Sequence, residues 1–408
     1  MLRVLHVLDH SWPILDGYCQ RSRNIVRAQR ELGIESVVLT GPAQEFDDPE
    51  AQDVDLDEIH YHRTPIGGGF AGQAIRNRRP LLREYLAVRL LRDRIRSLLD
   101  DSKFDLVHAH TPALCGLAGV LATSSRRMPL VYEIRSFWED SAVAQTKSTH
   151  RSARYRLGRA LETYVAKRAA AVVGISQAIL KDIAARGIST SKLFYVPNGV
   201  DAARFVPRAK DAALAAELGV NDVPILGYLG TLFPWEGIPW LVRAASQLYR
   251  NGARFKLLLV GDGMAADEVR RAIYDCSASS YVLFIGRVPN DQVERYYSVM
   301  DVLVYPRRSA RVAEMVTPLK PLEAMALGKA VLGSSVGGLR ELIDEYRTGV
   351  LFQTEDTDDF CKKASLLLAD AELRHRLGQA AREVVTREKD WVVLGRRYES
   401  LYESVLRR

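Results

Sequence analysis

The residues best suited to chemistry gather in residues 317–343, which read TPLKPLEAMALGKAVLGSSVGGLRELI. A proline between Lys320 and Glu323 fits the first position of a helix, and Glu323 then faces the positive end of the helix dipole. Gly337 and Gly338 open a second helix after a short apolar strand. Two helix N-termini beside small residues at one sheet edge predict a site for a diphosphate. An ordinary helix–strand–helix crossover with a surface carboxylate is the alternative.

The elements before this segment predict how it is positioned. Residues 224–232, 255–263, 281–288 and 301–306 read as apolar strands that end in glycine or small polar turns. Helical patterns separate these strands, and such alternation predicts a doubly wound α/β domain. Ligands bind beyond the carboxyl ends of the strands in domains of this kind.

The first part of the chain repeats the pattern, with strands predicted at 2–8, 36–40, 104–110 and 130–134. His110 ends the third of these strands. The fourth leads into Glu133, Arg135, Glu139 and Asp140, one of whose carboxylates could accept a proton from an acceptor hydroxyl. A structural ion pair between Glu133 and Arg135 is the equal alternative.

Length and composition limit the classes of protein to which the chain can belong. Its 408 residues predict two domains of roughly 200 residues each, and no apolar run approaches the ~20 residues that span a bilayer. The N-terminus is a strand pattern and not a signal peptide, so the protein is expected to stay in the cytoplasm. The four cysteines lack metal-ligand spacing, and no carboxylate pair has metal-binding character. Reduced thiols and no metal are therefore expected.

The net charge of +7 is concentrated in basic clusters. One of them falls on residues 81–99, where apolar residues recur at helical spacing among arginines. We predict a basic amphipathic helix that contacts an anionic membrane surface near a lipid-linked acceptor, with a solvated basic face as the equal alternative. Nucleic acid is not expected as a partner, because aromatic residues are not interleaved with the arginines.

The segment PLEAMALGKAVLGSSVGGLREL resembles the donor-binding segment of retaining glycosyltransferases of the GT-B architecture, family GT4. The sequence PNGVD, residues 197–201, resembles the end of the first domain in that family. The resemblance implies two Rossmann-like domains facing across a cleft, a nucleotide-sugar donor, and catalysis without metal or cofactor. The domains expected are residues 1–205, residues 206–385, and a helix over 386–408, within a last helical stretch at 381–408, that packs back on the first domain.

The resemblance also implies roles for single residues. Glu323 corresponds to the glutamate that binds the nucleotide ribose, and Arg287 lies where relatives contact the base through the backbone. Asp262 belongs to a turn that resembles the family's GDG sequence. His110 matches the second histidine of an HxH motif near the transferred sugar, whereas His108 is expected to point the opposite way and to be structural.

One departure from the family concerns the cations that neutralise the leaving diphosphate. The family commonly has an Arg directly after the first strand of the second domain and a Lys about six residues on. Here Gly230-Thr231 and Glu236-Gly237 stand at those places. We predict that Lys320 and Arg311 supply the charge instead, and that Arg307 lies in a solvated loop.

Two smaller departures complete the comparison with the family. Its paired-glutamate motif has Met315 at the first position, with Glu314 one residue out of register as a candidate ligand of a sugar hydroxyl. A loop with two glycines retains only Gly17, so close approach of the backbone to the donor is expected there alone.

These features predict a retaining hexosyltransferase that moves a sugar from a UDP-sugar, in preference to a GDP-sugar, to a glycan or lipid-linked glycan. The pair YEIRSFWED and VTPLKPLEAMALGK further resembles glycosyltransferases of exosortase-associated exopolysaccharide clusters. Two alternatives remain: a relative that binds sugar or nucleotide without catalysis, motivated by the missing cations, and a nucleotide-sugar 2-epimerase, against which the EAMA and GGLREL sequences argue.

Overall fold

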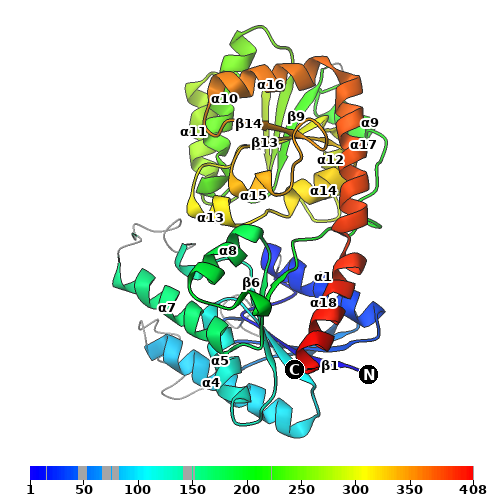
Figure 1. Cartoon of the computed structure of the whole chain (residues 1–408). Helices are drawn as coiled ribbons and strands as arrows, with labels where there is room; N and C mark the ends of the chain where they lie inside the picture. The colour runs from blue at the N-terminus through cyan, green and yellow to red at the C-terminus, as the bar shows by residue number, and fades with distance from the viewer. Residues whose placement is uncertain are drawn as a thin grey trace. The chain divides into compact units, whose positions relative to one another are not determined.

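The computed structural model describes residues 1–14, 16–44, 53–66, 75, 82–140, 149, 152–221 and 223–407 (Figure 1). The chain forms two compact units. Unit 1 comprises Met1–Pro197 together with Trp391–Arg408, and unit 2 comprises Asn198–Asp390. The chain therefore crosses from unit 1 to unit 2 after Pro197 and returns to unit 1 after Asp390. The sequence had suggested these two limits after residues 205 and 385.

Unit 1 is built on a sheet whose described strands are Arg3–Leu8 (β1), Glu35–Thr40 (β2), Val54–Leu56 (β3), Ile59–His62 (β4), Leu106–His110 (β5), Leu130–Ile134 (β6), Ala171–Gly174 (β7) and Leu193–Tyr195 (β8). Their order is β3-β4-β2-β1-β5-β6-β7-β8. All neighbouring pairs are parallel except β3 and β4. The direction of winding reverses between β1 and β5, so the ends of these strands form a topological switch point.

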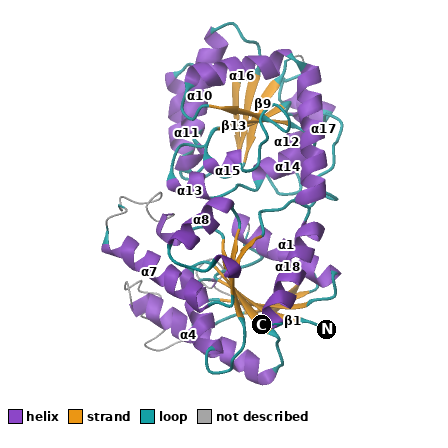
Figure 2. Ribbon diagram, in the orientation of Figure 1, coloured by secondary structure: helices purple, strands orange, loops and turns teal. Residues whose placement is uncertain are grey.

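The helices of unit 1 within the described residues are Gly17–Glu31 (α1), Leu82–Asp101 (α4), Ala113–Thr123 (α5), Ala153–Arg168 (α7), Gln177–Ala185 (α8) and Trp391–Leu406 (α18). Figure 2 shows helices on both faces of the sheet. Strands covered on both faces are largely apolar, and β1 follows this rule except at Arg3 and His6. Strand β5 departs from this rule, because its wholly buried sequence LVHAH includes two histidines.

Unit 2 has the described strands Ile225–Leu229 (β9), Lys256–Val260 (β10), Val282–Gly286 (β11), Val302–Tyr305 (β12), Ala330–Ser334 (β13) and Val350–Phe352 (β14). They form a parallel sheet in the order β11-β10-β9-β12-β13-β14. The winding reverses between β9 and β12, which places a second switch point there. The prediction of two doubly wound, Rossmann-like α/β units is confirmed.

The helices of unit 2 in the described ranges are Ala212–Glu217 (α9), Ile238–Arg250 (α10), Ala266–Asp275 (α11), Val293–Val299 (α12), Arg311–Met315 (α13), Lys320–Ala326 (α14), Gly337–Arg340 (α15), Thr357–Ala369 (α16) and Ala371–Glu388 (α17). The short helices α13, α14 and α15 follow β12 and β13, at the carboxyl edge of the sheet. Among the described residues, no helix combines the length and the apolar character needed to cross a bilayer.

The prediction of one last helix over 381–408 is wrong, because the helix breaks at Lys389 and Asp390. Their backbone leaves the helical path to pair with an earlier segment: the Val200 N–H donates to the Lys389 carbonyl at 2.9 Å. The Ala202 N–H donates to the Asp390 carboxylate at 3.1 Å. The chain then resumes as α18, which packs beside α1 in unit 1 and buries its apolar stripe, namely Trp391, Leu394, Tyr398, Leu401, Tyr402 and Val405.

Candidate functional site

The carboxyl edge of the unit 2 sheet carries the donor-site residues that the sequence singled out in this unit. Each follows a parallel strand: Gly230 and Thr231 follow β9, Asp262 follows β10, Arg287 follows β11, Arg311, Lys320 and Glu323 follow β12, and Gly337 and Gly338 follow β13. Because β11, β10, β9, β12 and β13 are consecutive in the sheet, these turns lie along one edge. The edge includes the switch point between β9 and β12.

Lys320 lies over Gly230 at this switch point. Its Nζ donates to the Tyr228 hydroxyl at 3.1 Å and lies 3.4 Å from the Thr231 carbonyl oxygen. A Cβ on Gly230 would fall 1.9 Å from Lys320 Cε, and the φ angle of Gly230 is +148°. Glycine is therefore what lets the ammonium group occupy this turn.

Glu236 and Tyr228 join Lys320 in a group that the sequence analysis missed. Glu236 is 6% exposed, and its Oε2 lies 3.5 Å from the Tyr228 hydroxyl that receives the Lys320 ammonium. A tyrosine near the end of the otherwise aliphatic strand β9 was the available signal, because a buried hydroxyl needs a partner.

The prediction that Arg307 lies in a solvated loop is wrong. Arg307 is 3% exposed, its Nη1 donates to the Val316 carbonyl at 2.9 Å, and its Nε lies 3.6 Å from Glu236 Oε1. A buried carboxylate needs a counter-charge, which accounts for the inward orientation of the guanidinium. The next residue, Arg308, does lie at the surface, where it pairs with Glu355 at 2.9 Å.

Burial and neighbouring charges act in opposite directions on the two ionisable groups of α14. Burial lowers the pKa of Lys320, while the Glu236 carboxylate opposes that shift. Burial raises the pKa of Glu323, against the hydrogen bond from the Tyr297 hydroxyl, which is 3.0 Å from Glu323 Oε2. Glu323 therefore lies half-buried at the sheet edge with a defined orientation and is not directed freely into solvent.

Gly337 and Gly338 allow α15 to approach α13 closely. A Cβ on Gly337 would lie 2.4 Å from the Glu314 carbonyl oxygen, and one on Gly338 would lie 2.2 Å from the Val316 carbonyl oxygen. The Gly337 N–H donates to the Glu314 carboxylate at 2.7 Å. The sequence analysis assigned the Gly337 N–H to the donor diphosphate, but in this structure the Glu314 carboxylate accepts its hydrogen bond.

Asp262 and Arg287 have exposed side chains at the same edge, and Arg311 is half-buried at the first position of α13. The turn that holds Asp262 contacts the turn after β9, since a Cβ on Gly261 would fall 1.9 Å from the Gly230 carbonyl oxygen. Asp262 Oδ1 accepts the N–H of the following glycine at 2.8 Å. These side chains therefore lie along the same edge of the sheet as Lys320.

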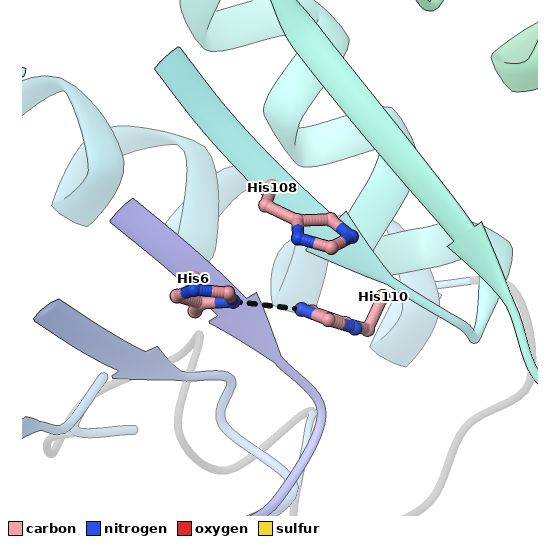
Figure 3. A group of neighbouring side chains, drawn as sticks. All are labelled: His6, His108 and His110. Atoms are coloured by element: carbon pink, nitrogen blue, oxygen red, sulfur yellow. Dashed lines mark hydrogen bonds between the residues drawn. The ribbon is translucent and has the colours of Figure 1, made fainter. Parts of the chain in front are cut away.

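In unit 1, His110 belongs to a buried cluster of three histidines from two adjacent strands. Figure 3 shows His6 on β1 and His108 and His110 on β5, with His6 Nδ1 3.0 Å from His110 Nε2. The rings of His108 and His110 are stacked with centroids 4.1 Å apart. The expectation that His108 points the opposite way is wrong, because residues two apart on a strand share a face.

Hydrogen bonds explain the histidine cluster better than a metal ion does. His6 Nε2 contacts the Gln29 side-chain oxygen at 2.8 Å, and Arg135 Nη2 donates to His110 Nδ1 at 2.8 Å. A cation bound there would face the Arg135 guanidinium. Burial lowers the pKa of His6 to about 4 and that of His110 to about 3, so both rings are neutral near pH 7.

Glu133, which is adjacent to the histidine cluster, pairs with two arginines. Its Oε1 lies 3.0 Å from Arg21 Nε and 2.8 Å from Arg135 Nε, and the Tyr398 hydroxyl of α18 donates to its other oxygen. Burial disfavours the carboxylate, but the two guanidinium groups hold the pKa of Glu133 well below its usual range. Of the two alternatives in the sequence, this geometry supports the structural ion pair.

Gly17 is exposed as the first residue of α1, which follows β1. The preceding Asp16 caps the helix by accepting the Cys19 N–H at 2.8 Å, and its other oxygen contacts His10 Nε2 at 2.7 Å. Gly17 thus lies beyond the carboxyl edge of the unit 1 sheet, beside its switch point.

The predicted basic helix over 81–99 corresponds to α4, which buries Leu86, Val88, Leu91, Ile95, Leu98 and Leu99. Several of its arginines have protein partners: Arg94 pairs with Asp53 at 3.0 Å, and Arg96 donates to the Leu121 carbonyl at 2.8 Å. The arginines at 76, 78 and 79 lie outside the described residues. Both alternatives for this helix, a membrane contact and a solvated basic face, stay predictions.

An apolar cavity of about 360 Å³ lies beyond the carboxyl end of β6, between α5 and α7. Leu114, Trp138, Leu157 and Leu161 line it, and the Arg154 guanidinium lies over the Trp138 ring. Trp138 and Leu157 are 38% and 58% exposed, which is unusual for large apolar side chains beside a cavity. The cavity is therefore suited to an apolar chain.

Two family models match the chain. The model described as Glycosyl transferases group 1 matches residues 211–384, and the one described as Glycosyl transferase 4-like domain matches residues 16–199. The first range lies within unit 2. The second range lies within unit 1, except that its last two residues belong to unit 2.

Two curated relatives illustrate the likeness. GDP-mannose-dependent alpha-(1-6)-phosphatidylinositol monomannoside mannosyltransferase of Mycobacterium tuberculosis is 30% identical over 210 residues, 50% of this chain and 54% of that protein. The chain thus spans about half the length of this relative. GDP-mannose-dependent alpha-mannosyltransferase of Mycolicibacterium smegmatis is 26% identical over 408 residues, 100% of this chain and 98% of that protein.

Among solved structures, HepE of Anabaena in complex with UDP aligns with a TM-score of 0.79 and 18% identity. The alignment covers 99% of this chain and 100% of that one. At this identity the likeness shows the fold, and the fold is the GT-B architecture that the sequence predicted.

Proposed function

Because the chain belongs to the group 1, GT4-like glycosyltransferases, a family of hexosyl-transferring enzymes, we propose that it moves a sugar from a nucleoside diphosphate sugar to an acceptor hydroxyl. The observation that carries the proposal is Lys320 seated over Gly230 at the unit 2 switch point. A fixed cation there is suited to the charge that develops on a leaving diphosphate.

The roles proposed for unit 2 follow from this placement. Lys320 and Arg311 neutralise the diphosphate, and Glu323, in the first turn of α14, binds the ribose hydroxyls. Lysine acts as a point charge, whereas arginine can bind a phosphate through two parallel hydrogen bonds. Thr231, Asp262 and the backbone at Arg287, which lie along the same edge of the sheet, complete the proposed donor site.

The nucleotide and the stereochemistry remain predictions from sequence. UDP is our proposed nucleotide: the aligned HepE structure holds UDP, whereas the two relatives named above are GDP-mannose-dependent by name. Calorimetric titration with UDP and with GDP tests the choice directly. Retention of anomeric configuration is tested by proton NMR of the first product formed, before mutarotation of any released sugar.

We propose a lipid-linked glycan as the acceptor, supported by the apolar cavity between α5 and α7. A role in exopolysaccharide synthesis and a contact between α4 and an anionic membrane rest on the sequence alone. Vesicle flotation with and without anionic lipid tests the membrane contact. A comparison of acceptors with and without a lipid chain tests the proposed acceptor.

The central experiment measures nucleotide affinity and donor hydrolysis for Lys320→Ala and Arg311→Ala. Loss of a hydrogen bond to a charged group is worth about 1.5–3 kcal/mol, so Lys320→Ala should weaken diphosphate binding about 10- to 100-fold. Lys362→Ala, at an exposed position on α16, is the matched control and should behave as wild type. A wild-type protein that binds neither UDP nor GDP and turns over no nucleotide sugar would refute the proposal.

A further inference from the structure

Glu236 and Lys320 meet at one hydroxyl group. The Tyr228 oxygen lies 3.1 Å from Lys320 Nζ and 3.5 Å from Glu236 Oε2, so the two charges are within about 7 Å of each other. The hydroxyl of Tyr228 also contacts the Thr231 carbonyl oxygen at 2.9 Å, directly beneath the ammonium. Tyr228 is fully buried, so this contact lies in a medium that screens charge weakly.

The turn that carries Glu236 is held in place by backbone contacts. Glu236 ends the short turn Pro234–Glu236, and the following Gly237 has a φ angle of +74°. A Cβ on Gly237 would lie 2.0 Å from the Pro306 carbonyl oxygen, and the Arg308 N–H donates to the Trp235 carbonyl at 2.8 Å. The turn is therefore packed against the segment after β12, and the Glu236 carboxylate lies 3.6 Å from Arg307 of that segment.

We propose that Glu236 is a positioning residue that, with Tyr228, holds the Lys320 ammonium over Gly230 and keeps it protonated for the leaving diphosphate. This inference rests on the proposed function of Lys320. It gives a role to a residue whose acidic type is opposite to the lysine that the family commonly has near this place. The carboxylate does not touch the donor and acts through the ammonium.

The charges around Lys320 account for the need for such a residue. The groups that act on its ammonium are Glu236, Arg307, and Glu323 on its own helix, and the Tyr228 ring centroid lies 5.3 Å from Nζ. The Tyr305 hydroxyl donates to the backbone carbonyl of Lys320 at 3.0 Å. Burial lowers the pKa of the Lys320 ammonium, and the Arg307 guanidinium adds to that shift. Glu236 and Glu323 oppose it, and the Glu323 carboxylate is itself subject to burial that raises its pKa.

The test is the pH dependence of nucleotide diphosphate affinity in Glu236→Gln, measured with UDP and GDP between pH 6 and 10. Removing the opposite charge of Glu236 lowers the pKa of the ammonium. The alkaline loss of affinity should therefore begin at a lower pH than in wild type, with up to about tenfold weaker binding in that window. Glu345→Gln, an exposed carboxylate that pairs with Lys363, is the control and should leave the profile unchanged.

Two further variants separate positioning from simple structural support. Tyr228→Phe removes the shared hydroxyl and should weaken nucleotide affinity at all pH values. The pH at which affinity falls on the alkaline side, here called the alkaline limb, should shift less than in Glu236→Gln. In Glu236→Gln with Lys320→Arg, the guanidinium stays charged, so the alkaline limb should disappear. If Glu236→Gln does not fold, Glu236→Asp replaces it and should give a partial shift.

A profile of the Glu236 variant that superimposes on the wild type would overturn the inference while leaving the proposed function intact. The same holds if the Lys320→Arg change does not remove the alkaline limb. Failure of the proposed function is recognised separately, because the wild type would then bind no nucleotide at any pH.

Discussion

Gly230→Ala is the substitution that tests the geometry of the donor site most directly. The three atoms that an added Cβ would meet first, at 1.9, 2.3 and 2.5 Å, are Cε, Nζ and Cδ of Lys320. They form the flexible end of a side chain, so the clash is relieved when the lysine moves away and not by disruption of the sheet. The variant should fold with its cation displaced.

The magnitude has two parts. A non-glycine residue at a φ angle of +148° carries backbone strain of about 1–3 kcal/mol, which lowers the free energy of unfolding. Displacement of Lys320 removes a charge-assisted contact with the diphosphate worth about 1.5–3 kcal/mol, which weakens nucleotide binding about 10- to 100-fold. Gly252→Ala is the matched control, because Gly252 has a φ angle of +94° with no atom near its added Cβ. It should be destabilised similarly and bind nucleotide normally.

The assay is calorimetric titration with nucleoside diphosphate, combined with thermal unfolding, for both single variants and for Gly230→Ala with Lys320→Ala. If Gly230 acts by admitting Lys320, its substitution should change affinity little once the lysine is absent. Independent, additive losses in the double variant would refute the reasoning. So would a Gly230→Ala variant that binds as tightly as wild type.

Two further predictions concern the pH dependence of stability. Burial raises the pKa of Glu162 from 4.5 to about 8, so its stabilisation is full below pH 4.5 and is lost as the pH rises towards 8. The free energy of unfolding of the wild type should therefore fall by roughly 3–5 kcal/mol between pH 5 and 9. Glu162→Gln, which keeps an acceptor for the Tyr132 hydroxyl, should remove this fall, whereas Glu31→Gln, at an exposed position, should not. Burial lowers the pKa of His6 from 6.5 to about 4, so stability present above pH 6.5 is lost on acidification towards pH 4, on the order of 3 kcal/mol. His6→Asn should flatten this acid limb, and an acid limb of the same size in the variant would argue against a neutral buried ring.

The sequence was sufficient to predict the sheets and the residues at their carboxyl edges, because buried parallel strands are apolar runs with glycine at their ends. It also predicted that Lys320 supplies the charge missing after β9, and the structure shows Lys320 at that turn because β9 and β12 are neighbours in the sheet. It could not pair Glu236 with Arg307, because residues 71 positions apart with no periodic relation give no local signal. The exposed-loop prediction for Arg307 failed for the same reason.

Unit 1 shows a different limit of sequence analysis. The HxH motif suggested one site histidine and one structural histidine, but the period of a strand places His108 and His110 on the same face. Their hydrogen bonds reach α1 through His6 and Gln29, and α18 through the Tyr402 hydroxyl, 2.7 Å from His108 Nδ1. A histidine at a strand end is compatible with a ligand site or with a buried network, and only the partners from distant segments distinguish the two.

The charges at the unit 2 switch point bear on the alternative of a protein that binds sugar without catalysis. Taken singly, Thr231 and Glu236 stand where the family commonly has cations, which suggests that the charge needed for catalysis has been lost. Taken together with Lys320 and Arg307, the carboxylate is surrounded by two cations drawn from the segment after β12. Glu323 on the same helix adds a second carboxylate, so the case for catalysis rests on the position of the Lys320 ammonium over Gly230 and not on a surplus of positive charge. Under the proposed function, the cation that the family commonly has after β9 comes here from the segment after β12, and the close fit between Gly230 and Lys320 holds its ammonium at that turn.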